Sequence, residues 1–215
     1  VYTRINNPTQ DAVEKRLAVL EHGKASLLVA SGMAATTLAI MNVAEAGDHV
    51  VASPYVYGGT YNLFKYTLPK FGIQFTFVDD ASDLDSWRNA VRPNTKAFFG
   101  EGLSNPLGVA LDLEGIANVA HEVGVPWIVD NTIATPYVTR PIDYGVDIVT
   151  HSATKFLSGH GSAMVGAIID SGNFDFAKHP DKFPGFNQPD PSYNNMVYAK
   201  DLGVGSAFGN VAYIF

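Results

Sequence analysis

Short apolar runs alternate with amphipathic segments along most of this chain. The short runs are rich in Val, Ile and Phe, and they predict strands at 26–30, 49–52, 74–78, 97–100, 127–130, 147–150 and 164–169. The amphipathic segments predict helices at 10–21, 33–45, 60–71, 84–91 and 113–123, with a short piece near 174–179. This alternation predicts an α/β fold around a mostly parallel sheet of about seven strands. Because the strands are apolar on both sides, helices are expected on both faces.

Local signals refine this pattern at a few places. Asp11 and Glu14 have the spacing of a capping box for the first helix, and Asp112 is the expected N-cap of the helix at 113–123. From 180 to 195 the pattern stops, and Pro, Asp, Asn and aromatic residues fill a long irregular stretch. Stretches of that length are usually functional or disordered.

Composition narrows the classes of protein to which the chain can belong. Its 215 residues are 47% hydrophobic and 16% charged, which is typical of a compact domain. The net charge of −7 comes without a basic stripe, so we expect no nucleic-acid partner. No apolar run approaches the roughly 20 residues that span a bilayer, so we expect no membrane partner. The lack of cysteine excludes a thiolate nucleophile, and it fits the cytoplasmic location that we expect, as it fits any other compartment.

The carboxyl ends of the predicted strands are where ligands of an open α/β sheet bind. The first strand leads into Ser31, Gly32 and Met33, where a helix starts. Ser31 is a suitable N-cap, and Gly32 lets an anion approach the free N–H groups at the positive end of the helix dipole. This segment is a candidate phosphate cradle, although Ser-Gly is also common at ordinary strand–helix junctions.

Two further turns bring candidate ligand-binding groups to the same edge. Tyr57 is followed by Gly58 and Gly59 at a helix start, so its ring either covers a flat ligand or packs in the core. Asn105 precedes a proline and is a turn residue first, but its amide can also bind a ligand oxygen.

The fifth and sixth strands lead to an aspartate and a lysine. Asp130 follows an apolar run, where a carboxylate needs a partner, so it is a candidate N-cap, metal ligand or counter-charge of a protonated ring nitrogen. Ser152 and Thr154 come shortly before Lys155. A lysine at this position either extends its head into water along the sheet or serves as an amine that forms a Schiff base with a carbonyl compound.

Considered together, these groups match the needs of one cofactor, pyridoxal 5′-phosphate (PLP). Its aldehyde needs a lysine amine, and its pyridinium nitrogen needs a carboxylate that preserves the electron sink. Its phosphate needs N–H and hydroxyl donors, and its ring has a face that an aromatic side chain can cover. No single element is specific for PLP, but the ordered set is.

Motifs spread over essentially the whole chain carry a resemblance to a known family. They are Tyr2-Thr3-Arg4 with Asn7-Pro8-Thr9, Ser31-Gly32-Met33-Ala34-Ala35, Tyr57-Gly58-Gly59-Thr60, Glu101 with Asn105-Pro106, Asp130-Asn131-Thr132 and Ser152-Ala153-Thr154-Lys155. In these motifs the sequence resembles the Cys/Met-metabolism PLP enzymes of the aspartate-aminotransferase fold. That family includes cystathionine γ-synthase and β-lyase, methionine γ-lyase and O-acetylhomoserine sulfhydrylase.

The resemblance implies a role in cofactor chemistry for three side chains. Lys155 would carry PLP as a Schiff base and later move protons. Asp130 would pair with the pyridine nitrogen. Tyr57 would stack on the ring and assist proton transfer.

The same resemblance implies which groups hold the rest of the cofactor. Its phosphate would be bound by N–H groups and hydroxyls of Gly32, Met33, Ser152 and Thr154. Asn105 would lie near the phenolic oxygen of the cofactor and the substrate carboxylate. Tyr2 and Arg4 would reach the phosphate of a neighbouring subunit, so the protein would self-associate as a dimer or tetramer.

Within the family, the segments 183–184 and 189–193 look most like those of O-acetylhomoserine sulfhydrylases. Such an enzyme would replace the acetate of O-acetylhomoserine with sulfide or a small thiol, giving homocysteine or methionine. A cystathionine γ-synthase or a methionine γ-lyase on the same scaffold is the nearest alternative. Gly59 stands where some methionine γ-lyases carry cysteine, which disfavours that activity.

The resemblance also sets an expectation about the ends of the chain. Family members have an N-terminal arm before the position of Tyr2 and a small C-terminal domain whose arginine binds the substrate carboxylate. The sequence starts without methionine and stops in an apolar run at 209–215. We therefore expect residues 1–215 to be the PLP-binding large domain of a longer protein, able to bind PLP but poor at turnover.

Three alternatives lie outside this family. A non-catalytic interaction domain that merely keeps the fold would bind no PLP. A nucleotide-binding Rossmann domain is disfavoured because no G-x-G-x-x-G follows the first strand. A zinc hydrolase that uses His151, His160 and Asp130 is disfavoured because no H-E-x-x-H spacing occurs.

Overall fold

A seven-stranded sheet forms the centre of the computed structural model, which describes residues 2–3 and 7–202. The strands are β1 (Ala25–Val29), β2 (His49–Ala52), β3 (Gln74–Phe77), β4 (Thr95–Glu101), β5 (Trp127–Asp130), β6 (Ile148–Ser152) and β7 (Gly166–Asp170). Their order in the sheet is β1-β7-β6-β5-β4-β2-β3. Strands β2 to β6 pair in parallel, whereas β7 is antiparallel to both β6 and β1. The predicted α/β fold with a mostly parallel sheet is confirmed.

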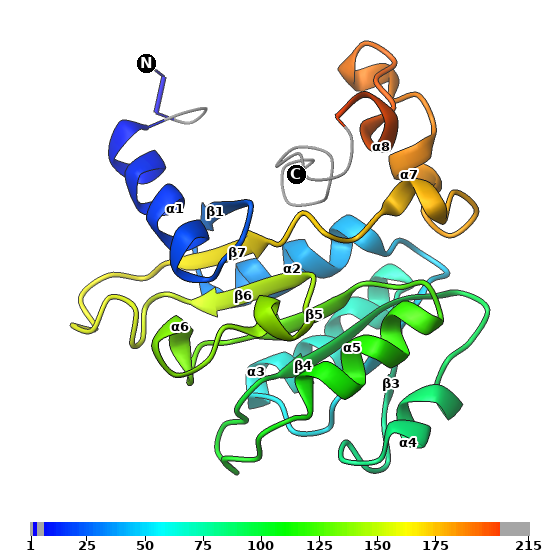
Figure 1. Cartoon of the computed structure of the whole chain (residues 1–215), viewed down its shortest axis with the longest axis horizontal. Coiled ribbons are helices and arrows are strands. Elements are labelled where there is room, and N and C mark those ends of the chain that lie inside the picture. Colours follow the sequence, from blue (N-terminus) through cyan, green and yellow to red (C-terminus); the bar gives the residue numbers. More distant parts are fainter. Residues whose placement is uncertain (1, 4–6, 203–215) are drawn as a thin grey trace.

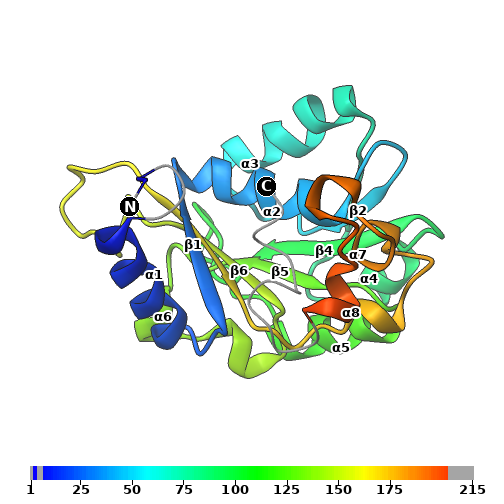
Figure 2. The ribbon, with the colours of Figure 1, turned by 90° about the horizontal axis from the view of Figure 1, so that it is seen from above.

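Helices cover both faces of this sheet (Figure 1). Figure 2 shows α2 (Gly32–Val43) and α3 (Gly58–Asn62) on one side and α5 (Leu113–Glu122) on the other. The remaining helices are α1 (Pro8–Leu20), α4 (Leu84–Asn89), α6 (Thr135–Val138), α7 (Pro184–Asn187) and α8 (Tyr198–Asp201). The helix expected at 60–71 is α3 followed by a π turn (Leu63–Thr67) and a 3-10 turn (Leu68–Phe71). Within the described residues, no helix has the length and apolar character needed to cross a membrane.

Alternate residues of the central strands build two separate cores. Ile128 and Ile148 pack on the side of α2, whereas Trp127, Val129 and Val149 pack on the side of α4 and α5. All five side chains are buried. Burying such a side chain stabilises the fold by roughly 1.5–3 kcal/mol, which explains why these strands are apolar on both faces.

The helix starts confirm one predicted cap and correct another. Asp112 caps α5 as predicted. Helix α1 instead begins after Asn7, whose side chain accepts two backbone N–H groups of the first turn. The predicted capping box is therefore wrong, because Asp11 lies inside the helix and Glu14 accepts the N–H of Leu28 in β1 at 2.8 Å.

The stretch 180–195, predicted to be irregular, contains two short helical segments, α7 and a 3-10 turn at Pro191–Tyr193, and its first half is packed. Phe183 and Phe186 are 2% and 3% exposed and contact the ring of Phe176. These rings join the core on the α2 side of the sheet. Aromatic packing without helical or strand periodicity explains why the sequence pattern did not indicate this role.

Asp170, at the end of β7, is expected to make the stability of the fold depend on pH. Its Oδ1 accepts the N–H of Gly172 at 2.9 Å, whereas its buried Oδ2 has no partner among the described residues. Burial, together with the charge of Asp147, raises the pKa of this carboxyl from 3.8 to about 7. Between these two pH values the folded state binds a proton that the unfolded chain has released, so the free energy of unfolding falls as the pH rises.

We expect Asp170→Asn to remove the contribution of Asp170 to the pH dependence of the free energy of unfolding. This contribution is at most about 4 kcal/mol between pH 3.8 and about 7. Urea unfolding at a series of pH values from about 4 to about 7.5 measures it. An exposed control, Asp181→Asn, should retain the wild-type slope. A slope that Asp170→Asn leaves unchanged would contradict the assignment.

Candidate active site

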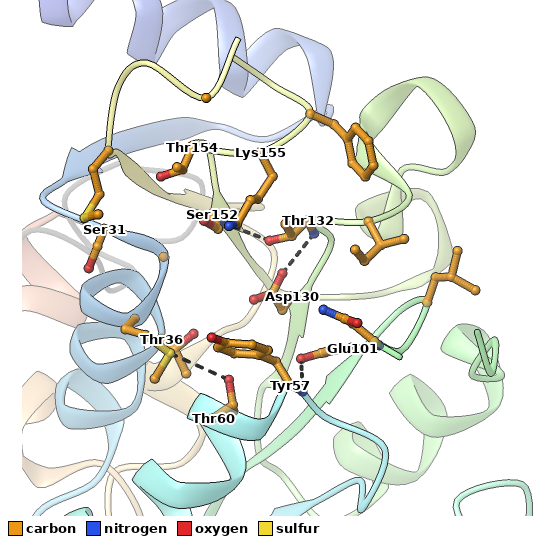
Figure 3. A pocket seen from close by; sticks show the side chains of 18 of the residues that line it. Ser31, Thr36, Tyr57, Thr60, Glu101, Asp130, Thr132, Ser152, Thr154 and Lys155 are labelled. Atoms are coloured by element: carbon orange, nitrogen blue, oxygen red, sulfur yellow. Dashed lines mark hydrogen bonds between the residues drawn. The ribbon is translucent and has the colours of Figure 1, made fainter. Parts of the chain in front are cut away.

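A cavity of about 690 Å³ lies at the carboxyl ends of β4, β5 and β6 and at the start of α2 and α3 (Figure 3). Most of the predicted site residues line it: Gly32, Met33, Tyr57, Asn105, Asp130, Ser152, Thr154 and Lys155. Tyr2 is 61% exposed and does not line the cavity, and Arg4 lies outside the described residues. The role predicted for Tyr2 and Arg4 concerns a neighbouring subunit and stays a prediction.

The start of α2 forms one wall of the cavity. Ser31 Oγ accepts the N–H of Ala34 at 3.1 Å, which confirms Ser31 as the N-cap. A Cβ atom on Gly32 would lie 2.5 Å from the Cβ of Ser152, so glycine lets this helix end approach β6. The first N–H groups of a helix have no partner within it, and they lie at the positive end of its dipole. Beside the Ser152 hydroxyl, these groups suit a phosphate.

Thr154 lines the cavity near this cradle, but its hydroxyl is already engaged. Oγ1 donates to the carbonyl of Val165 at 3.2 Å and accepts the N–H of Val165 at 3.0 Å. These bonds tie the turn that carries Lys155 to the segment before β7. Thr154 can therefore donate to a phosphate only by giving up its bond to the Val165 carbonyl.

Lys155 lies in the turn that follows β6. Its N–H donates to the carbonyl of Ser152 at 3.1 Å, and its carbonyl accepts the N–H of Gly159 at 2.9 Å, which fixes the backbone of the turn. The side chain lines the cavity, and Figure 3 shows it reaching toward Ser152 and Thr132. The residue is exposed and lines the cavity, so its amine is accessible to a bound carbonyl compound, and its covalent role stays a prediction.

Asp130 lies at the end of β5, in the wall of the cavity. Its Oδ1 accepts the N–H of Thr132 at 2.8 Å within the turn after β5. The predicted use of Asp130 as a helix N-cap is wrong, because the next helix, α6, begins at Thr135 with Ala134 as its N-cap residue. Burial raises the pKa of this carboxyl, while the bonds from Thr132 and the nearby His151 act against the rise. A cation bound beside Asp130, such as a protonated ring nitrogen, would favour the ionised form.

Thr132 joins the ends of two strands, a role that the sequence did not indicate. Its Oγ1 accepts the N–H of Ser152 at 2.7 Å, so the turn after β5 is tied to the end of β6. Thr132 also lines the cavity. The signal that could have found it is its place in the motif Asp130-Asn131-Thr132, two residues after Asp130.

Glu101 also lines the cavity, although in the sequence it stood out only as part of a motif with Asn105 and Pro106. The residue is 4% exposed, and its carboxylate accepts the N–H of Tyr57 at 2.5 Å and that of Asn105 at 3.1 Å. Burial, together with the charge of Asp130, raises the pKa of Glu101 to about 7. The signal that could have found it is a carboxylate that directly follows the apolar run 97–100.

Tyr57 and Asn105 lie in turns that border the cavity. Tyr57 precedes α3 and is 51% exposed, so the alternative in which its ring packs in the core is wrong. The ring lies over Gly59, where a Cβ atom would be 2.5 Å from it. Asn105 is confirmed as a turn residue, joined to Pro106 by a cis peptide bond.

The arrangement of the histidines does not support a zinc site. His151 is fully buried, and its Nε2 lies 2.5 Å from Oε1 of Glu21. His160 is exposed in the glycine-rich turn after Lys155. In the part of the chain that the structure describes, no three His, Asp or Glu side chains are grouped as metal ligands would be.

Comparisons with known proteins agree with this geometry. The family model described as Cys/Met metabolism PLP-dependent enzyme matches residues 1–207. The chain is 49% identical over 218 residues to homocysteine synthase of Schizosaccharomyces pombe. It is 50% identical over 212 residues to O-acetyl-L-homoserine sulfhydrylase of Corynebacterium glutamicum. These matches cover 100% and 97% of this chain but 49% and 48% of the relatives, so the chain spans about half the length of the curated relatives it matches.

A solved structure shares the fold. The crystal structure of a Campylobacter jejuni protein, provisionally assigned as an O-acetylhomoserine (thiol)-lyase, matches with a TM-score of 0.87 and 39% identity. The match covers 98% of this chain and 56% of that one, and that structure contains a pyridoxyl-lysine monophosphate. The chain belongs to the Cys/Met metabolism family of PLP-dependent enzymes.

Proposed function

We propose that the protein to which this chain belongs catalyses γ-replacement on O-acetyl-L-homoserine. Sulfide or a small thiol displaces acetate at Cγ, so that a C–O bond breaks, a C–S bond forms, and homocysteine or methionine results. The observation that carries this proposal is the convergence of Lys155, Asp130, Tyr57 and the start of α2 on one cavity. The names of relatives about half identical to the chain, homocysteine synthase and O-acetyl-L-homoserine sulfhydrylase, support this reaction over others in the family.

The residues of the cavity fit the parts of PLP, which when bound supplies an electron sink for charge at the substrate Cα. Lys155 Nζ would hold the cofactor and then carry protons at the substrate carbons. The Asp130 carboxylate would keep a proton on the ring nitrogen. The Tyr57 ring would cover one face of the cofactor, and the N–H groups at the start of α2 would bind its phosphate.

We further propose that the 215 residues supply the PLP-binding large domain and that a second domain binds the substrate α-carboxylate. The support is the length of the relatives, of which this chain spans about half. The complete enzyme would self-associate, with Tyr2 and Arg4 contributing to the phosphate site of a neighbouring subunit. Its partners would be a small amino-acid substrate and a sulfide or thiol.

Product analysis tests both proposals. The 215-residue chain and the full-length protein are each given PLP, O-acetyl-L-homoserine and sulfide, with methionine or cystathionine as rival substrates. The full-length protein should release homocysteine and acetate in equal amounts, and the 215-residue chain should be at least about tenfold slower because the carboxylate contact is worth more than about 1.4 kcal/mol. Equal rates would contradict the need for a second domain. Turnover of methionine or cystathionine without homocysteine formation from O-acetyl-L-homoserine would favour a γ-lyase.

A further inference from the structure

Glu101 connects two turns that border the cavity. Its Oε1 accepts the N–H of Tyr57, 44 residues earlier in the chain, at 2.5 Å, a bond drawn in Figure 3. Its Oε2 accepts the N–H of Asn105 at 3.1 Å. The turn before α3 and the turn after β4 are thus held by the two oxygens of one carboxylate.

Glu101 holds the N–H of Tyr57, whereas the carbonyl of Tyr57 accepts the N–H of Tyr61 at 2.9 Å. Tyr57 is the N-cap residue of α3, and its own side chain makes no capping hydrogen bond. The ring is half-exposed, so core packing does not fix it, and it lies over Gly59, which has no side chain to hold it. The Glu101 bond therefore sets the point from which the ring extends over the cavity.

The ionised form of Glu101, which predominates above its pKa of about 7, suits this role. An ionised carboxylate accepts both N–H bonds at once, and charge-assisted bonds of this kind are about twice as strong as neutral ones. The residue is 4% exposed, so water competes little for either oxygen. The carboxylate of Asp130 also lines the cavity and acts on Glu101 through its charge. Two carboxylates thus line the same cavity. Asp130 accepts an N–H of its own turn, whereas Glu101 accepts N–H groups of two different turns.

We propose that Glu101 is a positioning residue for the cofactor: its carboxylate fixes the Tyr57 turn against the Asn105 turn, so that ring and amide approach PLP from set positions. This inference rests on the proposed PLP site. Glu101 acts through Tyr57 and Asn105 and needs no contact with the reacting atoms.

Two substitutions and a matched control test the proposal. Glu101→Gln keeps the size of the side chain but turns one acceptor oxygen into an amide that faces an N–H donor, and Glu101→Ala removes both acceptors. Asp147→Asn is the control. Asp147 is also buried and accepts a backbone N–H, that of Trp127 at 2.8 Å, but it lies at the other end of β5 and β6 and does not line the cavity.

Three measurements on the full-length protein separate positioning from stability. They are hydrogen exchange of the Tyr57 and Asn105 amides without PLP, the dissociation constant of PLP, and the visible circular dichroism of lysine-bound PLP. In Glu101→Gln, exchange at one or both amides should rise at least about tenfold. The dissociation constant should rise about tenfold, and the dichroism should change while PLP stays on the lysine. Asp147→Asn should lower the melting temperature and leave all three readouts at their wild-type values.

The outcomes distinguish this inference from the proposed function. If the wild-type protein forms lysine-bound PLP and Glu101→Gln has wild-type exchange, affinity and dichroism, the positioning role alone is overturned. Equal changes in Asp147→Asn and Glu101→Gln would also overturn it, because the effect would then reflect general stability. If the wild-type protein forms no lysine-bound PLP, both the proposed function and the positioning role of Glu101 are overturned.

Discussion

Lys155→Ala is expected to abolish the lysine-bound PLP of this protein. Lys155 is the lysine among the residues that line the cavity, and a Schiff base with PLP needs an unprotonated lysine amine. Alanine removes the amine but keeps the backbone bonds of the turn to Ser152 and Gly159, so the fold should survive. After unbound PLP is removed, the wild-type protein should be yellow and the variant colourless.

Borohydride reduction followed by peptide mass mapping makes this test specific. The wild-type protein should carry a reduced pyridoxyl group on the peptide that contains Lys155, and the variant should carry none. Lys70→Ala, at an exposed lysine of the 3-10 turn after α3, should behave as the wild type. A comparable amount of pyridoxyl-lysine in Lys155→Ala would refute the assignment. The absence of PLP from both proteins would favour the non-catalytic interaction domain.

The strands, and the edge of the sheet that carries the site, could be predicted from the sequence. A strand that is buried on both faces is a continuous apolar run, and such runs are visible in the sequence. β5 is an example: its apolar run at 127–129 ends in Asp130, and both the run and the polar end are visible without a structure. The strand called 164–169 instead begins at Gly166, because Met164 lies at the cavity and is 74% exposed. An apolar residue beside a ligand site thus looks like a core residue in the sequence.

The roles of residues that depend on contacts between distant segments could not be predicted from the sequence. Glu101 acquires its role because the fold brings Tyr57, 44 residues away, onto one of its oxygens. Thr154 lines the cavity, and its predicted contact with a phosphate stays a prediction, whereas its bonds to Val165 depend on how the turn closes. The capping box failed for a local reason: Asn7 competes for the same helix start, and spacing alone does not rank two candidate caps.

Gly166→Ala is expected to damage both the fold and the phosphate cradle. A Cβ atom on Gly166 would lie 1.9 Å from the carbonyl oxygen of Ser31, the residue that caps α2. Gly166 pairs with Val29 on one side and Ser152 on the other, so β7 cannot shift without straining two ladders. Overpacking typically costs about 1–3 kcal/mol, and a clash with backbone should reach the upper end of this range. Urea unfolding measures this loss, and Gly185→Ala, with open space around its Cβ, should show less than about 1 kcal/mol.

Comparing the binding of PLP with that of pyridoxal, which lacks the phosphate, distinguishes damage to the phosphate cradle from a general loss of stability. Displacing Ser31 moves the N–H groups at the start of α2, and these groups contact only the phosphate in the proposed site. Gly166→Ala should therefore weaken PLP binding at least about tenfold while changing pyridoxal binding much less, a difference of about 1.4 kcal/mol. Lys155→Ala should remove the covalent attachment of both compounds, since both carry the aldehyde. Equal weakening of PLP and pyridoxal by Gly166→Ala would show that the glycine serves the fold alone and that the phosphate lies elsewhere.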